Sequence, residues 1–156
     1  LPDGVQRVVQ ALRAAGVTAE LRLFQDRSTR TAEDAARSVG AEVGRIVKSL
    51  VFMAGEEPVV VLASGAHRVD EARLASVVGS PVRRASPEQA RQATGFAIGG
   101  IPPLGHPRRL RTLMDRALLG YDRVWAAAGA PNALFAVDPR ELQRATGAAV
   151  VDVAER

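Results

Sequence analysis

The sequence contains no cysteine and only two histidines among its 156 residues. Without cysteine the chain can form no disulfide, no thiolate-bound zinc site, no iron–sulfur cluster and no cysteine nucleophile. His67 and His106 lie far apart in the chain, and no carboxylate spacing around them suggests a metal site. We therefore expect neither a metal ion nor a cofactor.

Long hydrophobic runs are also missing, so no membrane-spanning helix and no membrane partner are expected. The first residues lack the basic and apolar segments of a signal peptide. The absence of cysteine favours a cytoplasmic protein. Hydrophobic residues make up 47% of the chain and charged residues 24%, which is typical of a folded globular protein rather than a disordered one. No linker or repeat interrupts the chain, so residues 1–156 are expected to form a single domain.

Lysine is nearly absent. The chain has 21 basic residues and a net charge of +4, yet Lys48 is the only lysine. Codon composition or a thermophilic origin could favour arginine throughout, and Lys48 could have survived by chance. Alternatively, Lys48 does something that arginine cannot, because a lysine ammonium is a compact charge whose pKa falls readily on burial.

Helices and strands alternate along the chain, with several strands following one another across short turns. This order predicts an α+β fold with a mixed, largely antiparallel sheet and helices around it. Capping residues such as Thr31, Ser86 and the glycines that follow each helix mark the helix ends. The expected helices are 2–15, 32–39, 69–78, 87–94 and 138–147, with a helical turn at 115–119. The expected strands are 17–24, 45–53, 58–63, 81–85, 96–98, 110–114, 123–127, 133–137 and 148–153.

Lys48 falls inside the apolar strand predicted at 45–53. Alternation places Ile46, Lys48 and Leu50 on one face of that strand, and Val47, Ser49 and Val51 on the other. A lysine in this setting either extends its ammonium to water from the end of a strand, or presents a cation to a phosphate, a carboxylate or an ester carbonyl.

A loop rich in glycine and proline follows at 99–107 and begins Gly99-Gly100-Ile101-Pro102. Glycine lets a backbone approach a ligand closely, and proline stiffens the loop. Such a loop can direct N–H groups at a carbonyl oxygen or a developing oxyanion, or it can be an ordinary turn. His106 lies beside it and could transfer a proton or be incidental.

Arginines cluster after this loop. They could form a phosphate-binding face together with Arg83 and Arg84, or only a solvated surface. Aromatic residues make up just 4% of the chain, so a broad platform for stacking single-stranded RNA is not expected. The clustered residues are Arg108, Arg109, Arg111 and Arg116.

Taken together, several motifs resemble the YbaK/prolyl-tRNA-synthetase-associated family. Its members are free-standing aminoacyl-tRNA deacylases and relatives of the editing domain inserted in bacterial prolyl-tRNA synthetases. The resemblance covers almost the whole chain in order and implies a six- or seven-stranded mixed sheet curled into a partial barrel with helices outside. The motifs are TAEDAA (31–36), IVKSLVF (46–52), GGIPPLG (99–105), GAPNALFAVDPREL (129–142) and ATGA (145–148).

The resemblance implies hydrolysis of the ester in a mischarged tRNA, such as tRNA-Pro carrying cysteine, alanine or another small amino acid. Lys48 matches the family's essential lysine, and Gly99 and Gly100 match the loop whose N–H groups hold the aminoacyl carbonyl. Water attacks with help from a ribose hydroxyl of the substrate, so neither a side-chain nucleophile nor a cofactor is needed.

The implied partners are the mischarged tRNA and prolyl-tRNA synthetase; the sequence predicts no oligomeric state. Phe24 stands where cysteine-specific members tend to carry tyrosine, and Leu134 stands where they carry an acid. The amino acid on the substrate tRNA can therefore be alanine, serine or threonine as well as cysteine. Two alternatives remain: a non-catalytic module that binds tRNA or aminoacyl-adenosine, and a small-molecule hydrolase or binder that uses the same cleft. The residues expected to bind substrate are Phe24, Thr31, Ser49, Leu50, Ile101, Pro102, His106 and Gly129, and those expected to bind tRNA are Arg108, Arg109 and Arg111.

Overall fold

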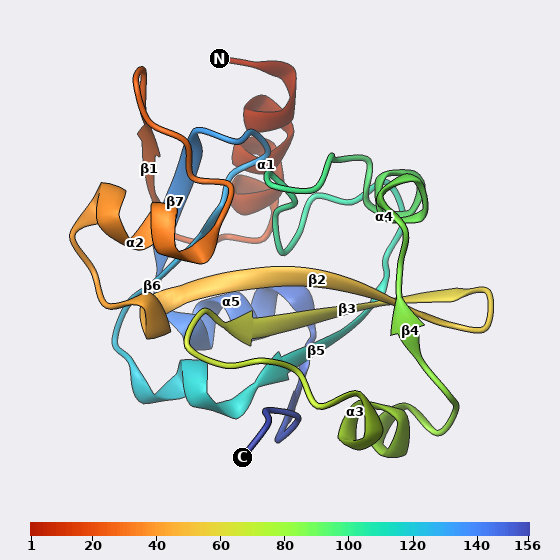
Figure 1. Cartoon of the computed structure of the whole chain (residues 1–156). Coiled ribbons are helices and arrows are strands. Elements are labelled where there is room, and N and C mark those ends of the chain that lie inside the picture. The colour runs from red at the N-terminus through yellow and green to blue at the C-terminus, as the bar shows by residue number, and fades with distance from the viewer.

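The computed structural model describes residues 1–156 as five α-helices around one eight-stranded sheet (Figure 1). No helix combines the length and the apolar character that a bilayer crossing requires. The helices are α1 (Asp3–Ala14), α2 (Ala32–Val39), α3 (Glu71–Val78), α4 (Pro87–Thr94) and α5 (Pro139–Thr146). The strands are β1 (Glu20–Leu23), β2 (Ile46–Ala54), β3 (Glu57–Ser64), β4 (Arg83–Arg84), β5 (Arg111–Asp115), β6 (Val124–Ala127), β7 (Ala133–Val137) and β8 (Ala149–Val151).

The helices begin and end where the local signals placed them. At the start of α4, the Ser86 hydroxyl accepts from the Gln89 N–H in a complete capping box, and Pro87 occupies the first helical position. The Thr31 hydroxyl caps α2 in the same way by accepting from the Asp34 N–H. Gly40 ends α2 with a φ of 66°, a left-handed conformation that favours glycine. The predicted helices are thus confirmed to within a few residues.

The strand expected at 96–98 is wrong. The segment turns back on itself instead, because local groups satisfy its backbone. The Thr94 hydroxyl donates to the Ala90 carbonyl at 2.7 Å and accepts from the Phe96 N–H, and the Gly100 N–H donates to the Ala97 carbonyl. A segment whose polar groups are satisfied this way has no need of a neighbouring strand.

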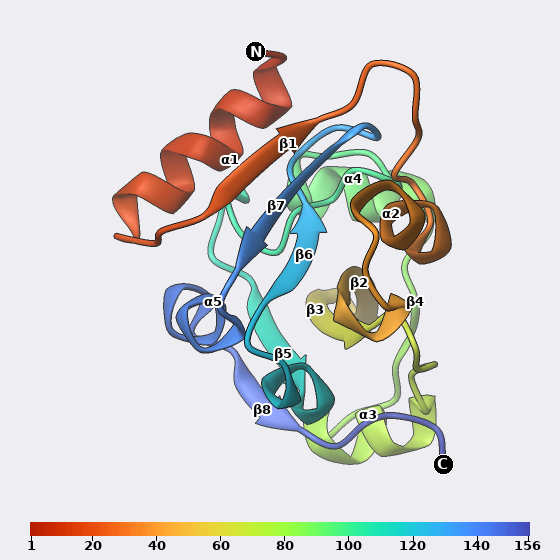
Figure 2. The same cartoon turned by 90° about the vertical axis from the view of Figure 1, so that its left-hand side faces the viewer.

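The sheet is mixed, with strand order β1-β7-β6-β2-β3-β5-β8 and β4 paired to β2 off this path. Four of its pairings are antiparallel and three are parallel. The sheet curves strongly but stays open, because its end strands β1 and β8 do not pair with each other (Figure 2). The α+β class is confirmed, and the sheet has eight strands rather than six or seven.

Apolar side chains fill the inside of this curve and cover both ends of its outer surface. The largest cluster joins α1 residues such as Val5 and Val8 to inward-facing residues of β2, β3, β6 and β7. A second cluster packs α2 against Ile46 and Trp125, and a third packs α3 against Phe52 and its neighbours. The outer face of β2 therefore carries packed side chains at each end, with a gap between the α2 and α3 clusters.

One edge of β2 is only partly paired, and this positions the site. β3 pairs with β2 from Val47 to Ala54 on one side. On the other side, β6 pairs only with Ile46 and Val47, and β4 pairs only with Phe52 and Met53. On this second side, residues 48–50 therefore have no neighbouring strand. β6 pairs with β2 before these residues, and β4 pairs with it after them.

Candidate functional site

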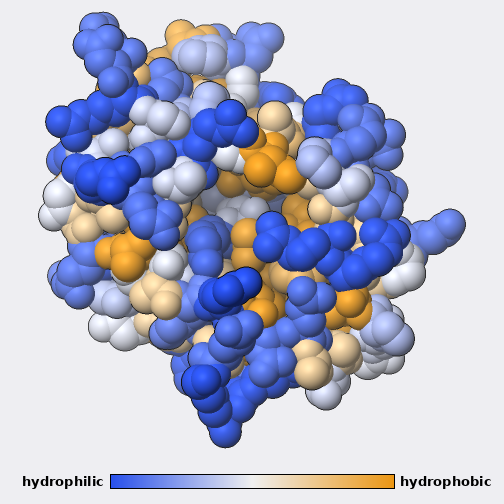
Figure 3. Space-filling model, in the orientation of Figure 1, coloured by the Kyte–Doolittle hydropathy of each residue, from blue (hydrophilic) through white to orange (hydrophobic).

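A cavity of about 320 Å³ opens along the unpaired edge of β2. Its walls are the start of α2 with the loop before it (29–33), residues 46–51 of β2, Arg84 of β4, and Ile98, Gly99 and Ile101. In Figure 3 this face of the molecule is hollowed at its centre, with hydrophobic and hydrophilic surface both bordering the hollow. A volume near 300 Å³ is at the lower end for small-molecule sites, which suits a compact ligand group.

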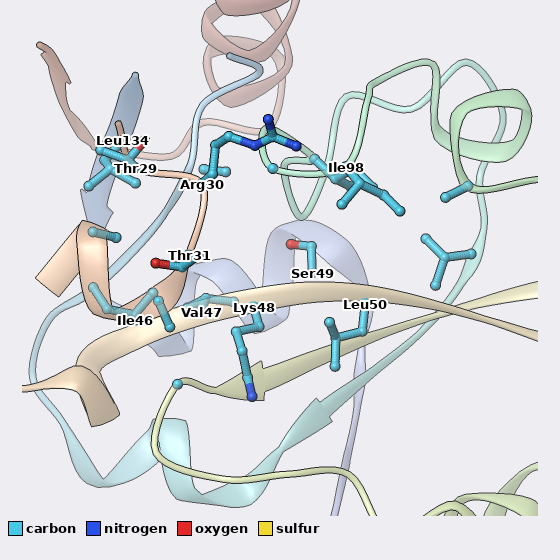
Figure 4. Close-up of a pocket in the computed structure, with 18 of the residues that line it drawn as sticks. Thr29, Arg30, Thr31, Ile46, Val47, Lys48, Ser49, Leu50, Ile98 and Leu134 are labelled. Atoms are coloured by element: carbon cyan, nitrogen blue, oxygen red, sulfur yellow. The ribbon is translucent and has the colours of Figure 1, made fainter. Parts of the chain in front are cut away.

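Lys48 lines this cavity and is half-buried. Its Nζ donates a hydrogen bond to the carbonyl of His67 at 2.5 Å. Burial lowers the pKa of Lys48; the charges of Arg84 and Arg68 lower it further, whereas Glu33 and Asp115 oppose the shift. In Figure 4, Lys48 and Ser49 point to opposite sides of β2, as the strand alternation predicted.

Asp115 and His67 lie behind the Lys48 ammonium. Asp115 is 3% exposed, and its Oδ2 lies 3.1 Å from His67 Nδ1. Its Oδ1 accepts from the N–H of Ala117 at 3.0 Å. Sequence reasoning missed this pair, because Asp115 and His67 are separated by 48 positions and no local pattern links them.

Ser49 retains unused hydrogen-bonding capacity within the cavity wall. Its hydroxyl is buried with no partner, and so is the hydroxyl of Thr29, a residue only 4% exposed. The carbonyl of Val51 accepts from Ala85 on the β4 side of β2. Because backbone groups two residues apart point the same way in a strand, the N–H and C=O of Ser49 face the unpaired edge.

Two arginines, Arg30 and Arg84, line the cavity without a carboxylate partner. Arg30 packs over Gly99, where an added Cβ would lie 2.7 Å from Arg30 Nε. The Arg84 guanidinium lies 5.5 Å from the centre of the Phe52 ring. Glu33 is the one acidic residue of the lining. The cavity is therefore rich in positive charge and suits an anionic ligand.

Six of the predicted site residues come together at this cavity. They come from α2's cap, from β2 and from the glycine loop, which are distant in sequence. These residues are Thr31, Lys48, Ser49, Leu50, Gly99 and Ile101. Arg30, Glu33 and Thr29 join them, although sequence reasoning assigned them no role; their position beside the Thr31 cap was the available signal.

Gly100 does not line the cavity, unlike Gly99. Its N–H donates to the Ala97 carbonyl at 3.1 Å, so it is not free to receive a substrate oxygen. An added Cβ would lie 3.0 Å from the backbone carbon of Ala130. The glycine at position 100 therefore permits the loop to pack closely on the turn between β6 and β7.

Four further residues expected to bind substrate also lie outside the cavity lining. Phe24 packs against the α2 cluster, and Gly129 packs against Gly4 at the start of α1. His106 Nε2 lies 2.9 Å from the Pro102 carbonyl, and burial lowers the pKa of His106. Pro102, the fourth of these residues, contacts the His106 ring through that carbonyl.

The three arginines expected to bind tRNA all lie outside the cavity lining, and Arg109 shares one hollow with Arg108 and another with Arg111. Arg108 shares a shallow hollow with Arg83, next to β4. Arg109 lies against Gly147 at the end of α5, and Arg111 donates to the Val78 carbonyl. Of the three, Arg108 alone also shares a hollow with Arg83, the chain neighbour of Arg84 at the cavity.

The structure brings no three histidine, aspartate or glutamate side chains together as a set of metal ligands. The site thus consists of a cation-lined cavity, an unpaired strand edge and a single half-buried lysine.

Residues 26–145 match the aminoacyl-tRNA editing domain family. The protein YwhH of Bacillus subtilis (strain 168), of uncharacterized function, is 31% identical over 116 residues, which is 74% of each chain. The proline–tRNA ligase of Limosilactobacillus fermentum is 36% identical over 111 residues, covering 67% of this chain but only 19% of the ligase. A crystal structure described as a candidate trans-editing enzyme for prolyl-tRNA synthetase superposes with a TM-score of 0.94 at 47% identity, covering 100% of this chain and 99% of the other.

Proposed function

Because this chain belongs to the aminoacyl-tRNA editing domain family, we propose that it is a deacylase of mischarged tRNA. It hydrolyses the ester that joins a small, incorrect amino acid to the 3′-terminal adenosine, and tRNA-Pro is the tRNA it clears. The similarity to a proline–tRNA ligase and to a candidate trans-editing enzyme supports this choice of tRNA. This deacylation is part of translation quality control in the cytoplasm, where the protein acts alongside prolyl-tRNA synthetase.

The observation that carries the proposal is the unpaired edge of β2 beside the only lysine. The Ser49 N–H on this edge donates to the ester carbonyl, and the Ser49 C=O accepts from the substrate's α-ammonium group. Water adds to the carbonyl carbon, the bond to the ribose oxygen breaks, and that oxygen leaves with a proton. Lys48 stabilises the negative charge that develops during this addition.

The charges of the cavity favour the nucleotide end of tRNA over a free aminoacyl ester. An aminoacyl ester carries no negative charge, whereas the terminal nucleotides are joined by phosphodiesters. Arg30 and Arg84 line the cavity with no carboxylate to neutralise them, so they bind those phosphates. The amino acid itself is one of cysteine, alanine, serine or threonine.

A second candidate function is binding without hydrolysis, as an aminoacyl-adenosine or tRNA module attached to a synthetase. Two observations favour it. The Lys48 ammonium is engaged by the His67 carbonyl, on the side of β2 opposite Ser49. In addition, the Gly100 N–H donates to the Ala97 carbonyl, so it is not available to bind an oxyanion.

Single-turnover deacylation separates the two functions. The protein is mixed with tRNA-Pro charged with alanine, cysteine, serine, threonine or proline, and binding is measured on the same samples. The deacylase proposal expects rapid loss of at least one incorrect amino acid while prolyl-tRNA stays intact. Tight binding of every tRNA with hydrolysis no faster than in buffer would establish the binding module instead.

A further inference from the structure

We propose that Asp115 and His67 are positioning residues that hold the Lys48 ammonium in place through the backbone carbonyl of His67. This inference rests on the proposed deacylase function, because it assigns a task to groups behind the catalytic lysine. Neither side chain needs to touch the substrate for this task.

The buried carboxylate of Asp115 joins three separate parts of the fold. It ends β5, and its Oδ1 accepts from the Ala117 N–H in the turn that follows. Its Oδ2 accepts a hydrogen bond from the N–H of Ser64, at the end of β3, with an N···O distance of 3.4 Å. The same oxygen lies 3.1 Å from His67 Nδ1. A carboxylate with only 3% exposure is costly unless it is hydrogen-bonded, and these contacts supply the bonds.

The turn that carries the His67 carbonyl is fixed at both of its ends. The His67 N–H donates to the Ser64 carbonyl at 3.0 Å, and the Ser64 hydroxyl donates to the Gly44 carbonyl at 2.8 Å. After His67, the Arg68 carbonyl accepts from the Glu155 N–H at 2.8 Å, and the imidazole adds a further attachment because its Nδ1 reaches Asp115. Removing the imidazole leaves the carbonyl in the chain but removes the side-chain contact that ties His67 itself to Asp115 of β5.

Lys48 needs such an anchor because its four-carbon stem is flexible. An ammonium has three donor hydrogens, so the contact with the His67 carbonyl occupies one and leaves two for the substrate. An anchored cation loses less conformational entropy when the transition state forms. No other lysine exists in the chain, so none can take its place.

The test compares His67→Ala with His67→Asn. The asparagine amide nitrogen is separated from the backbone by the same number of bonds as Nδ1, so His67→Asn keeps a donor for Asp115 while His67→Ala removes it. The His67 side chain is 38% exposed, so both variants are expected to fold. Thermal unfolding of each variant provides the check on folding.

Two measurements are made on the wild type and on both variants. The first is the NMR signal of the Lys48 ammonium in protein labelled with ¹⁵N-lysine, where the single lysine gives a single side-chain signal. The second is kcat and KM for the best mischarged tRNA. The first measurement needs no activity, so it tests the anchor even if the deacylase proposal fails.

We expect the ammonium hydrogens of His67→Ala to exchange with water several-fold faster than those of the wild type. We also expect kcat to fall by about tenfold or more with KM little changed, because a displacement of about 1 Å in a catalytic group can cost about 10²-fold. His67→Asn should restore both values. Unchanged exchange in His67→Ala, a kcat equal to or above that of the wild type, or equal losses in both variants would each overturn the positioning role.

Discussion

Lys48 occupies a position on β2 that an apolar side chain would fill at lower cost in folding free energy. Its neighbours on the same face, Ile46 and Leu50, pack into the clusters formed with α2 and α3. Partial burial of the ammonium lowers the pKa of Lys48. A group kept in an unfavourable state of this kind is typical of a functional site, where stability is given up for activity.

The first prediction is that Lys48→Met stabilises the protein at neutral pH, by at most about 1 kcal/mol because the ammonium is half-exposed. The folded-state pKa of Lys48 is below its unfolded value, so the unfolded chain binds more protons between those two values. Wild-type stability therefore rises with pH across that window. Urea unfolding near pH 7 and near pH 10 should show the advantage of Lys48→Met shrinking as pH rises; a constant advantage would contradict the assignment.

At the scale of elements, the 96–101 segment is held between two other loops. Arg30 packs over Gly99 on one side, and Ala130 lies against Gly100 on the other. Gly99 has a φ of 98°, which requires glycine, whereas Gly100 is required for close approach. The two adjacent glycines therefore serve different purposes, one beside the cavity and one in the packing behind it.

The second prediction concerns Gly100→Ala. The added methyl group meets the Ala130 backbone, which cannot move aside as a flexible side chain could. We expect the free energy of unfolding to fall by about 1–3 kcal/mol, while the folded fraction deacylates normally. Gly120→Ala is the matched control, because nothing lies within 4 Å of its Cβ position. Wild-type stability combined with a greatly reduced single-turnover rate would contradict this packing role and assign Gly100 a catalytic one.

The sequence was sufficient for features whose causes are local. Ser86, Pro87 and the capping glycines determine helix ends within a few residues of themselves, and strand alternation correctly separated Lys48 from Ser49. Pairing between distant segments was not predictable in this way. The unpaired edge of β2 exists because β6 and β4 meet it at different ends, and the role of Asp115 depends on a contact 48 positions away.

At the scale of the whole molecule, a row of arginines leads from the cavity to a neighbouring hollow, which Glu56 also lines. Arg84 lines the cavity, its neighbour Arg83 follows it in β4, and Arg83 shares a hollow with Arg108. Arg109 and Arg111 do not line the hollow that holds Arg83, and they share a separate hollow beside Gly147 and Ala149. We expect the acceptor stem of tRNA to follow the route from Arg84 to Arg108 once its 3′ end occupies the cavity.

The third prediction is that the double variant Arg83→Ala/Arg108→Ala weakens binding of whole tRNA more than binding of aminoacyl-adenosine. Its affinity for whole tRNA should also depend less steeply on salt, because fewer phosphates are neutralised in the complex. The double variant Arg13→Ala/Arg156→Ala removes the same charge from other parts of the surface and should change little. Equal weakening by the two double variants would show that net charge alone governs binding.

The central claim is that ester hydrolysis takes place at the β2 edge beside Lys48, and single-turnover deacylation by Lys48→Ala and Lys48→Arg tests it most directly. Both proteins should fold as the wild type does, as judged by thermal unfolding on the same samples. We predict that the rate of Lys48→Ala falls by about 10²–10³-fold. Lys48→Arg should recover little of that rate, because a guanidinium is bulkier and differently hydrated. Turnover by folded Lys48→Ala at the wild-type rate would contradict the central claim.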